Sequence, residues 1–271
     1  MRSSRSLPDA RTAVEVVSER LGELLHSQPT AQVPIEGSLW TVRDAAAHLV
    51  CTTTLYSELA AGAVSPITEF TPQAAAEFNA HRIADIALSE PAALAKSLAA
   101  ATDGFVEITS RRSGSTAIRY HGDLTLDLGQ LTGFLLGEYL LHGYDIALAT
   151  EAPWPIDPSY AALALHAYAP AYPRVTEPAT VDGHSATYLV RLGLAGAVAM
   201  RFTDGALQIE LATDIVDDDR FDCVITADPV AYLLVSSGRL SQWTAIALGL
   251  ISASGRRPEL ASSFGALFRR F

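Results

Sequence analysis

Glu138 and His142 are the residues whose types and spacing most clearly permit chemistry in this sequence. They lie four residues apart in LTGFLLGEYLLHGYDIALA, residues 131–149, and the apolar spacing of this stretch predicts a helix. Residues four apart project from the same helix face, one turn apart. Apolar side chains occupy the remaining faces, so we expect protein to cover this helix nearly all round. A lone ionised carboxylate there would cost several kcal/mol, so Glu138 needs a metal ion, a cation or a proton.

A third candidate, His48, lies on a second predicted helix. Thr41 can cap the start of this helix, and Asp44 can return the hydrogen bond from three residues further on. The apolar spacing that follows points His48 towards the other helices. Two histidines and one carboxylate on neighbouring helices suit Zn²⁺ or a similar divalent ion and leave one position open for water or substrate. The alternative is that Glu138 and His142 bond each other and that His48 is an ordinary buried histidine.

The other polar residues near these three have simpler expected roles. Asp145 could orient His142 from three residues away, or it could bond solvent or an arginine. We expect Arg43 to be a solvated helix residue and Cys51 to be a small buried one. The remaining histidines lack partners at ligand spacing, and we expect them on the surface or in loops: His26, His81, His121, His166 and His184.

The first half of the chain is predicted to be all-α, with four or so long helices. The predicted helices cover residues 11–26, 41 onwards, 74–89, 91–110 and 131–149, with a loop or short extended piece at 120–128. A proline-rich segment at 151–158 is the candidate boundary. We therefore expect one domain over residues 1–155 and a second over residues 156–271.

The second half changes to alternating apolar and polar residues, which predicts strands. The predicted strands are 186–192, 198–202, 207–211, 221–226 and one near 250–254. Asp204-Gly205 between two of them is a hairpin signal. We expect helices near 160–169, at 229–237, from 241 and at 258–271. Together the two halves predict an α+β protein with a helical N-terminal bundle and a smaller α+β domain.

Composition excludes several classes of partner. The formal net charge of −11 over 271 residues argues against nucleic acid and anionic membrane, which attract clustered Lys and Arg. We expect no membrane span, because no apolar stretch reaches the length of about 18 residues that a span requires. Only two cysteines are present, and the start has no apolar export signal, so we expect a cytoplasmic protein in a reducing compartment. A single lysine among many arginines, with abundant alanine, is typical of a GC-rich source.

Two motifs together resemble a known family. They are WTVRDAAAHL, residues 40–49, and GEYLLHGYD, residues 137–145. The sequence is similar to the mycothiol-dependent maleylpyruvate isomerases, whose N-terminal domain is a DinB-like metal-binding four-helix bundle. The resemblance implies that His48, Glu138 and His142 bind the metal. The segments VITADP, 224–229, and SGRL, 237–240, look like the sterol-carrier-like C-terminal domain of the same family.

The resemblance implies a metal-dependent enzyme that uses a low-molecular-weight thiol. In the family this thiol is mycothiol, a co-substrate made by actinobacteria. A divalent ion lowers the pKa of a coordinated thiol, so the thiolate becomes available as a nucleophile at neutral pH. We expect an isomerase or an S-transferase acting on an electrophilic small molecule. The alternative is a non-catalytic protein that binds a lipid or another apolar metabolite through its C-terminal domain.

Overall fold

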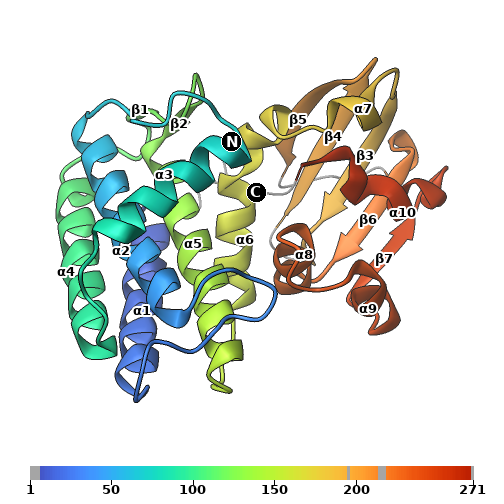
Figure 1. The fold of residues 1–271 in the computed structure, drawn as a ribbon. Helices are drawn as coiled ribbons and strands as arrows, with labels where there is room; N and C mark the ends of the chain where they lie inside the picture. Colours follow the sequence, from blue (N-terminus) through green and yellow to red (C-terminus); the bar gives the residue numbers. More distant parts are fainter. Residues whose placement is uncertain (1–6, 194–195, 213–217, 270–271) are drawn as a thin grey trace. The chain divides into compact units, whose positions relative to one another are not determined.

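The computed structural model describes residues 7–193, 196–212 and 218–269 of the chain. Contacts divide the chain into two compact units, one that ends at Ile156 and one that begins at Asp157. The first unit is helical, and the second contains a sheet with helices packed beside it (Figure 1). This arrangement confirms the predicted α+β class. Within the described residues, no helix is both long enough and apolar enough to cross a membrane.

Four long helices form the first unit. They are α1 (Leu7–His26), α2 (Val42–Ala61), α4 (Pro91–Ser110) and α5 (Leu128–Ala149). Both α1 and α2 contact both α4 and α5, so each helix has two neighbours around a shared core. This is the predicted four-helix bundle. A shorter helix, α3 (Pro72–Asp85), packs on α2. The strands β1 (Ala117–Arg119) and β2 (Thr125–Asp127) pair as a short antiparallel hairpin before α5.

Side-chain caps fix where α2 and α5 begin. At α2, the backbone N–H of Thr41 donates to Asp44 Oδ2 at 2.9 Å, and Thr41 Oγ1 accepts from the backbone N–H of Asp44, which confirms the predicted capping box. At α5, Asp127 and Gln130 form an equivalent pair with distances of 2.8 and 2.7 Å. Helix α5 therefore begins at Leu128, three residues before its predicted start, because a capping pair places the first turn there.

A buried hydroxyl network joins all four long helices. Tyr139 Oη of α5 lies 2.8 Å from Thr53 Oγ1 of α2 and 2.7 Å from Thr102 Oγ1 of α4. Ser18 Oγ of α1 lies 2.9 Å from the same Thr102 hydroxyl. Each threonine hydroxyl also lies within hydrogen-bonding distance of the backbone carbonyl one turn earlier, so every hydroxyl of the network has a partner inside the core. The network fixes the axial register of the bundle, because a shift of any helix would separate these hydroxyls.

Gly143 lets an indole ring pack directly against α5. A Cβ atom at Gly143 would lie 2.1 Å from Cζ2 of Trp154, a separation that no real side chain tolerates. The indole Nε1–H of Trp154 donates to the carbonyl of Leu140 at 3.1 Å, and the guanidinium of Arg20 lies 4.5 Å from the ring centroid. The second half of α5 is thereby held against α1 and the segment that follows α5.

The second unit is built on a five-stranded sheet with the order β5-β4-β3-β6-β7. The strands are β3 (Ala186–Arg191), β4 (Ala197–Thr203), β5 (Ala206–Ala212), β6 (Cys223–Ala227) and β7 (Ile251–Ser254). Neighbouring strands are antiparallel except for β3 and β6, which are parallel. The turn at Asp204 and Gly205 has φ angles of 49° and 82°, as the predicted Asp-Gly hairpin requires. Helices α6 (Pro158–Ala167) and α8 (Pro229–Ser236) contact each other.

The predicted last helix, 258–271, is confirmed only in part. Helical turns run without a gap from Pro258 to Leu267, as a 3-10 turn, the short helix α10 (Ala261–Phe264) and a second 3-10 turn. The chain is extended at Phe268, and residues 270 and 271 lie outside the described chain. At this point Phe268 packs 5.6 Å from the ring of Tyr172 and forms an isolated bridge with Thr176. Tertiary contacts of the extended end outweigh helix continuity there.

His121 lies in a loop between β1 and β2, which is one of the two places that the sequence predicts, but it is not on the surface. His121 follows β1 in sequence but is only 7% exposed. Its ring stacks on Tyr120 at 3.9 Å, and Nδ1 lies 2.8 Å from Ser65 Oγ. Burial lowers the pKa of His121 to about 4, with the charge of Glu138 opposing the shift. By contrast His26 and His81 are exposed, as predicted.

We expect Tyr139→Phe to destabilise the protein by about 1–3 kcal/mol, because two buried threonine hydroxyls lose a partner. The measurement is the free energy of unfolding from chemical denaturation. Tyr144→Phe is the matched control on the same helix, and it should change stability by less than about 0.5 kcal/mol. Equal stability of Tyr139→Phe and wild type would contradict the structural role given to the network.

His121 should make the protein less stable in acid. Its pKa in the folded protein, about 4, lies below the ordinary value of 6.5, so the unfolded chain binds a proton that the folded chain does not. Stability is therefore lost as the pH falls from 6.5 towards 4, by up to about 3 kcal/mol from this residue. Unfolding free energies of His121→Asn measured across this range should fall less steeply than those of wild type. His81→Asn, which removes an exposed histidine, should follow the wild-type curve.

Candidate metal centre

The structure brings His48, Glu138 and His142 together where α2 packs against α5. His48 Nε2 lies 3.1 Å from Glu138 Oε2, and His142 Nε2 lies 3.4 Å from the same oxygen. One ligand atom from each residue fits within 4.8 Å of the others. These are the three residues that the sequence singles out. Glu138 and His142 lie one turn apart on α5, and the contact between α2 and α5 brings His48 to them.

Asp145 completes the polar array from the next turn of α5. Its Oδ2 lies 3.1 Å from His142 Nδ1. A carboxylate at this distance accepts the Nδ1–H and fixes the ring orientation, so Nε2 points at Glu138. Of the two roles that the sequence leaves open for Asp145, orientation of His142 is the one that this contact supports.

Two carboxylates on one imidazole require a cation. A neutral imidazole has a single N–H, so His142 can donate to Asp145 or to Glu138 but not to both. With the proton on Nδ1, the lone pair of Nε2 would face the ionised Glu138 oxygen. Either a second proton on His142 or a metal ion beside Nε2 removes this repulsion.

The pKa shifts agree with this geometry. Burial acts to raise the pKa of Glu138, but the two histidines outweigh it and hold this pKa far below the usual range. Burial acts to lower the pKa of His142, but Asp145 and Glu138 outweigh it and raise this pKa. Burial dominates at His48 and lowers its pKa. The shifts therefore favour an ionised Glu138 and a neutral His48, and of the two histidines His142 is the one whose protonated form the carboxylates stabilise.

Exposure is unequal across the three side chains. The side chain of His48 is 6% exposed and that of His142 is 15% exposed, whereas that of Glu138 is 31% exposed. The two histidines are thus enclosed, and the cluster opens on the side of the carboxylate.

The sequence gives no signal for the role of Trp40, which precedes the N-cap residue Thr41. Its ring centroid lies 5.0 Å from that of His48 and 5.5 Å from that of His142. The two imidazole rings meet edge to face at 4.9 Å. Trp40 is at the end of a predicted loop, where helical and strand periodicity provide no direction for a side chain. Only the fold reveals that it packs on both histidines.

Two neighbours of His48 face away from the cluster. The prediction that Arg43 is solvated is wrong, because its guanidinium donates to the carbonyls of Ile83, Ile86 and Leu88 at the end of α3. Cys51 is buried, as predicted, and its Sγ contacts the carbonyl of Arg82 at 3.3 Å. Burial raises the pKa of the Cys51 thiol, which keeps it protonated.

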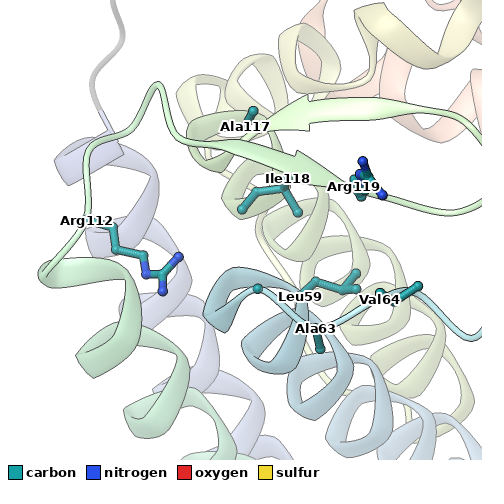
Figure 2. Close-up of a pocket in the computed structure, with 8 residues that line it drawn as sticks. Leu59, Ala63, Val64, Arg112, Ala117, Ile118 and Arg119 are labelled. Atoms are coloured by element: carbon teal, nitrogen blue, oxygen red, sulfur yellow. The ribbon is translucent and has the colours of Figure 1, made fainter.

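A pocket of about 240 Å³ lies in a different part of the bundle, at the end of α2. Figure 2 shows Ile118 and Arg119 of β1 on one side of it and Leu59 and Val64 on the other. Arg112 also lines it and donates to the carbonyl of Ala61. None of its lining residues is a histidine, cysteine, aspartate or glutamate, so this pocket lacks the ligand types of the metal cluster.

Several solved structures resemble the chain. Among them are the mycothiol-dependent maleylpyruvate isomerase, with 16% identity and a TM-score of 0.52, and a histidine-to-alanine variant of it, with 15% identity and a TM-score of 0.54. Each match covers 92% of this chain and 93% of the other. At such identities the likeness concerns the fold. No curated protein matches the sequence.

The family assignment comes from the sequence itself. Residues 10–147 match the family model described as the mycothiol maleylpyruvate isomerase N-terminal domain. This segment is just over half of the chain and includes α2, all but the last two residues of α5, and all three residues of the cluster. The protein therefore belongs to the mycothiol maleylpyruvate isomerase N-terminal domain family.

Proposed function

We propose that this protein binds a divalent metal ion, with Zn²⁺ as the expected ion, through His48, Glu138 and His142, and uses it to activate a low-molecular-weight thiol. Mycothiol is the expected thiol, because the family and the structural neighbours carry its name. The second substrate is an electrophilic small molecule. The observation that carries the proposal is the convergence of three ligand atoms within 4.8 Å, with His142 already oriented by Asp145.

The donor set fits a divalent ion. Two imidazole nitrogens and one carboxylate oxygen are ligands that Zn²⁺ accepts, and three protein ligands leave a position for a substrate. Charge supports the same ion. In a metal-bound site both imidazoles would be neutral, and a divalent cation would balance the nearby carboxylates of Glu138 and Asp145 better than a single proton does. Nε2 of His142 has its lone pair available, because Nδ1–H is committed to Asp145.

The bound ion would supply one chemical effect, which is to lower the pKa of a thiol so that it is a thiolate at neutral pH. The residues of the chain do the rest. His48 stays neutral because it is buried, Glu138 stays ionised, and Asp145 holds the ring of His142. The exposed side of Glu138 is where a thiol and an electrophile can approach.

Two outcomes are open to such a thiolate. In an isomerase, the sulfur adds to a carbon of a conjugated double bond, the electron pair moves to the conjugated carbonyl, rotation occurs about the new single bond, and elimination returns the thiol. In a transferase the carbon–sulfur bond is kept and the adduct leaves after a proton reaches the former double bond. Both reactions need the same activated thiol. The site therefore supports thiol activation in general, and the structure of the electrophile determines whether isomerisation or transfer follows. We expect a soluble, cytoplasmic enzyme in either case.

The alternative function is a binding protein for a lipid or another apolar metabolite, through the second unit. It stays a prediction, as does the sterol-carrier resemblance of that unit. Native mass spectrometry that detects a co-purified lipid, together with no thiol-dependent turnover, would favour this alternative over the enzyme.

The first test is the metal content of purified protein. Wild type should contain about one zinc per chain, and His142→Ala should lose it because one of three ligands is gone. His81→Ala is the matched control, since His81 is an exposed histidine outside the cluster, and it should retain the metal. Absence of metal from wild type, even after reconstitution with Zn²⁺, would make the three residues a structural hydrogen-bonded group and would contradict the proposal.

The second test concerns the thiol. Protein loaded with Zn²⁺ should consume or isomerise an electrophile, with maleylpyruvate as the first probe, only when mycothiol is present. His48→Ala and His142→Ala should lose this thiol-dependent rate, and His81→Ala should keep it. A metal-loaded wild type that turns over no member of a panel of conjugated carbonyl compounds with mycothiol would contradict thiol activation while leaving the metal site intact.

Asp145→Asn should lower metal affinity by roughly 10- to 100-fold, the usual effect of losing a carboxylate that orients a histidine ligand. The effect should be smaller than that of His142→Ala, because the ligand itself remains. Competition with a chromophoric chelator gives the dissociation constants. An affinity equal to that of wild type would show that the Asp145 contact does not support the ligand.

A further inference from the structure

Trp40 contacts two of the three candidate metal ligands, although it is not a ligand itself. Its indole packs on the rings of His48 and His142 at centroid distances of 5.0 and 5.5 Å, with interplanar angles of 42° and 38°. One ring thus covers two side chains that come from different helices. Both histidine side chains are nearly enclosed, at 6% and 15% exposure.

The backbone around Trp40 holds the indole firmly. The carbonyl of Trp40 accepts from Ile35 N at 2.9 Å, and its backbone N–H donates to Ser38 Oγ at 3.1 Å. The next residue, Thr41, bridges to Pro34 and caps α2. Trp40 is therefore tied to the same helix start that positions His48, and its ring is a fixed wall of the cluster.

From these contacts, and resting on the proposed function, we propose that Trp40 is a positioning residue that closes the histidine side of the metal site, so that a further ligand enters only beside Glu138. The exposure of the three side chains supports this direction, since only Glu138 is substantially open, at 31%. An enclosed histidine side leaves no room for an extra water ligand there. The single open position would then be left for the thiol, and the indole, tilted 42° and 38° to the imidazoles, lies beside groups that would share the positive charge of a bound ion.

The position of the Trp40 indole would affect the pKa of a thiol bound to the ion. Zn²⁺ sites with three protein ligands readily expand from four to five ligands when water can reach them. An additional water would donate charge to the ion and weaken its effect on the pKa of the thiol. Trp40 thus acts through coordination number, without touching the reacting atoms.

Co²⁺ substituted into the full-length protein tests this inference, because four-coordinate Co²⁺ absorbs visible light several times more strongly than five- or six-coordinate Co²⁺. Wild type and Trp40→Phe should show the strong bands. Trp40→Ala should lose roughly half or more of the molar absorbance, as water enters the space of the indole. Leu39→Ala is the matched control, because Leu39 is the adjacent residue and is fully exposed, and its spectrum should equal that of wild type.

The outcomes separate this inference from the proposed function. Failure of wild type to bind Co²⁺ or Zn²⁺ would overturn the metal site itself. Stoichiometric Co²⁺ in Trp40→Ala with an unchanged spectrum would overturn only the role of Trp40.

Fluorescence gives a second measurement that does not depend on the folding of Trp40→Ala. Co²⁺ quenches a tryptophan that lies beside it, so wild type should lose the emission of Trp40, while Zn²⁺ should cause no such loss. Trp40→Phe retains Trp154, which packs against Gly143 beside His142, and Trp243, so it should keep some quenching by Co²⁺ but clearly less than wild type. Equal quenching in wild type and Trp40→Phe would overturn the inference.

Discussion

The packing of α2 against α5 places the ionised carboxylate of Glu138 between the imidazole rings of His48 and His142. Much of the bundle stabilises this arrangement. Glu138 lies within 3.4 Å of Nε2 of both His48 and His142, so its charge is stabilised by nitrogen atoms rather than by water alone. Removal of either ring would leave a partly buried charge without its partner, at a cost of several kcal/mol. The same geometry places two imidazole nitrogens and a carboxylate oxygen where a divalent ion could bind all three, which is the basis of the proposed metal site.

Precision in this cluster depends on contacts that lie outside it. Tyr139, the residue after Glu138, is fixed by hydroxyls from α2 and α4, and Gly143, the residue after His142, admits the indole of Trp154. Each ligand on α5 therefore has an immediate neighbour that is locked to another part of the bundle. Because hydrogen bonds and close packing tolerate little displacement, the distance between α2 and α5 is set before any metal arrives.

The sequence predicts much of this structure because its strongest signals are local. The capping pair at Thr41 and Asp44, the spacing of Glu138 and His142, and the Asp204-Gly205 turn each depend on a few adjacent residues. The failures involve contacts between distant segments. The last helix ends early because Phe268 is extended and packs on Tyr172, and His121, in its predicted loop, is buried through its contact with Ser65. The contacts of Trp40 could not be predicted for the same reason, since no periodicity within a loop specifies which rings a side chain will contact.

Arg43 links two helices in a way that affects how the bundle opens. Its guanidinium donates to carbonyls at the C-terminal end of α3 and just beyond it, where the regular helical hydrogen bonds run out. Helix α3 is otherwise weakly anchored, because Ile83 is its only fully buried residue among those described. Arg43 itself belongs to the first turn of α2, five residues before His48. Fraying of α3 is therefore coupled to the start of α2, the helix that carries His48, so the two helices unfold locally as one cooperative unit. A metal ion bound at the proposed site should then slow amide exchange in α3, although α3 contributes no ligand to that site.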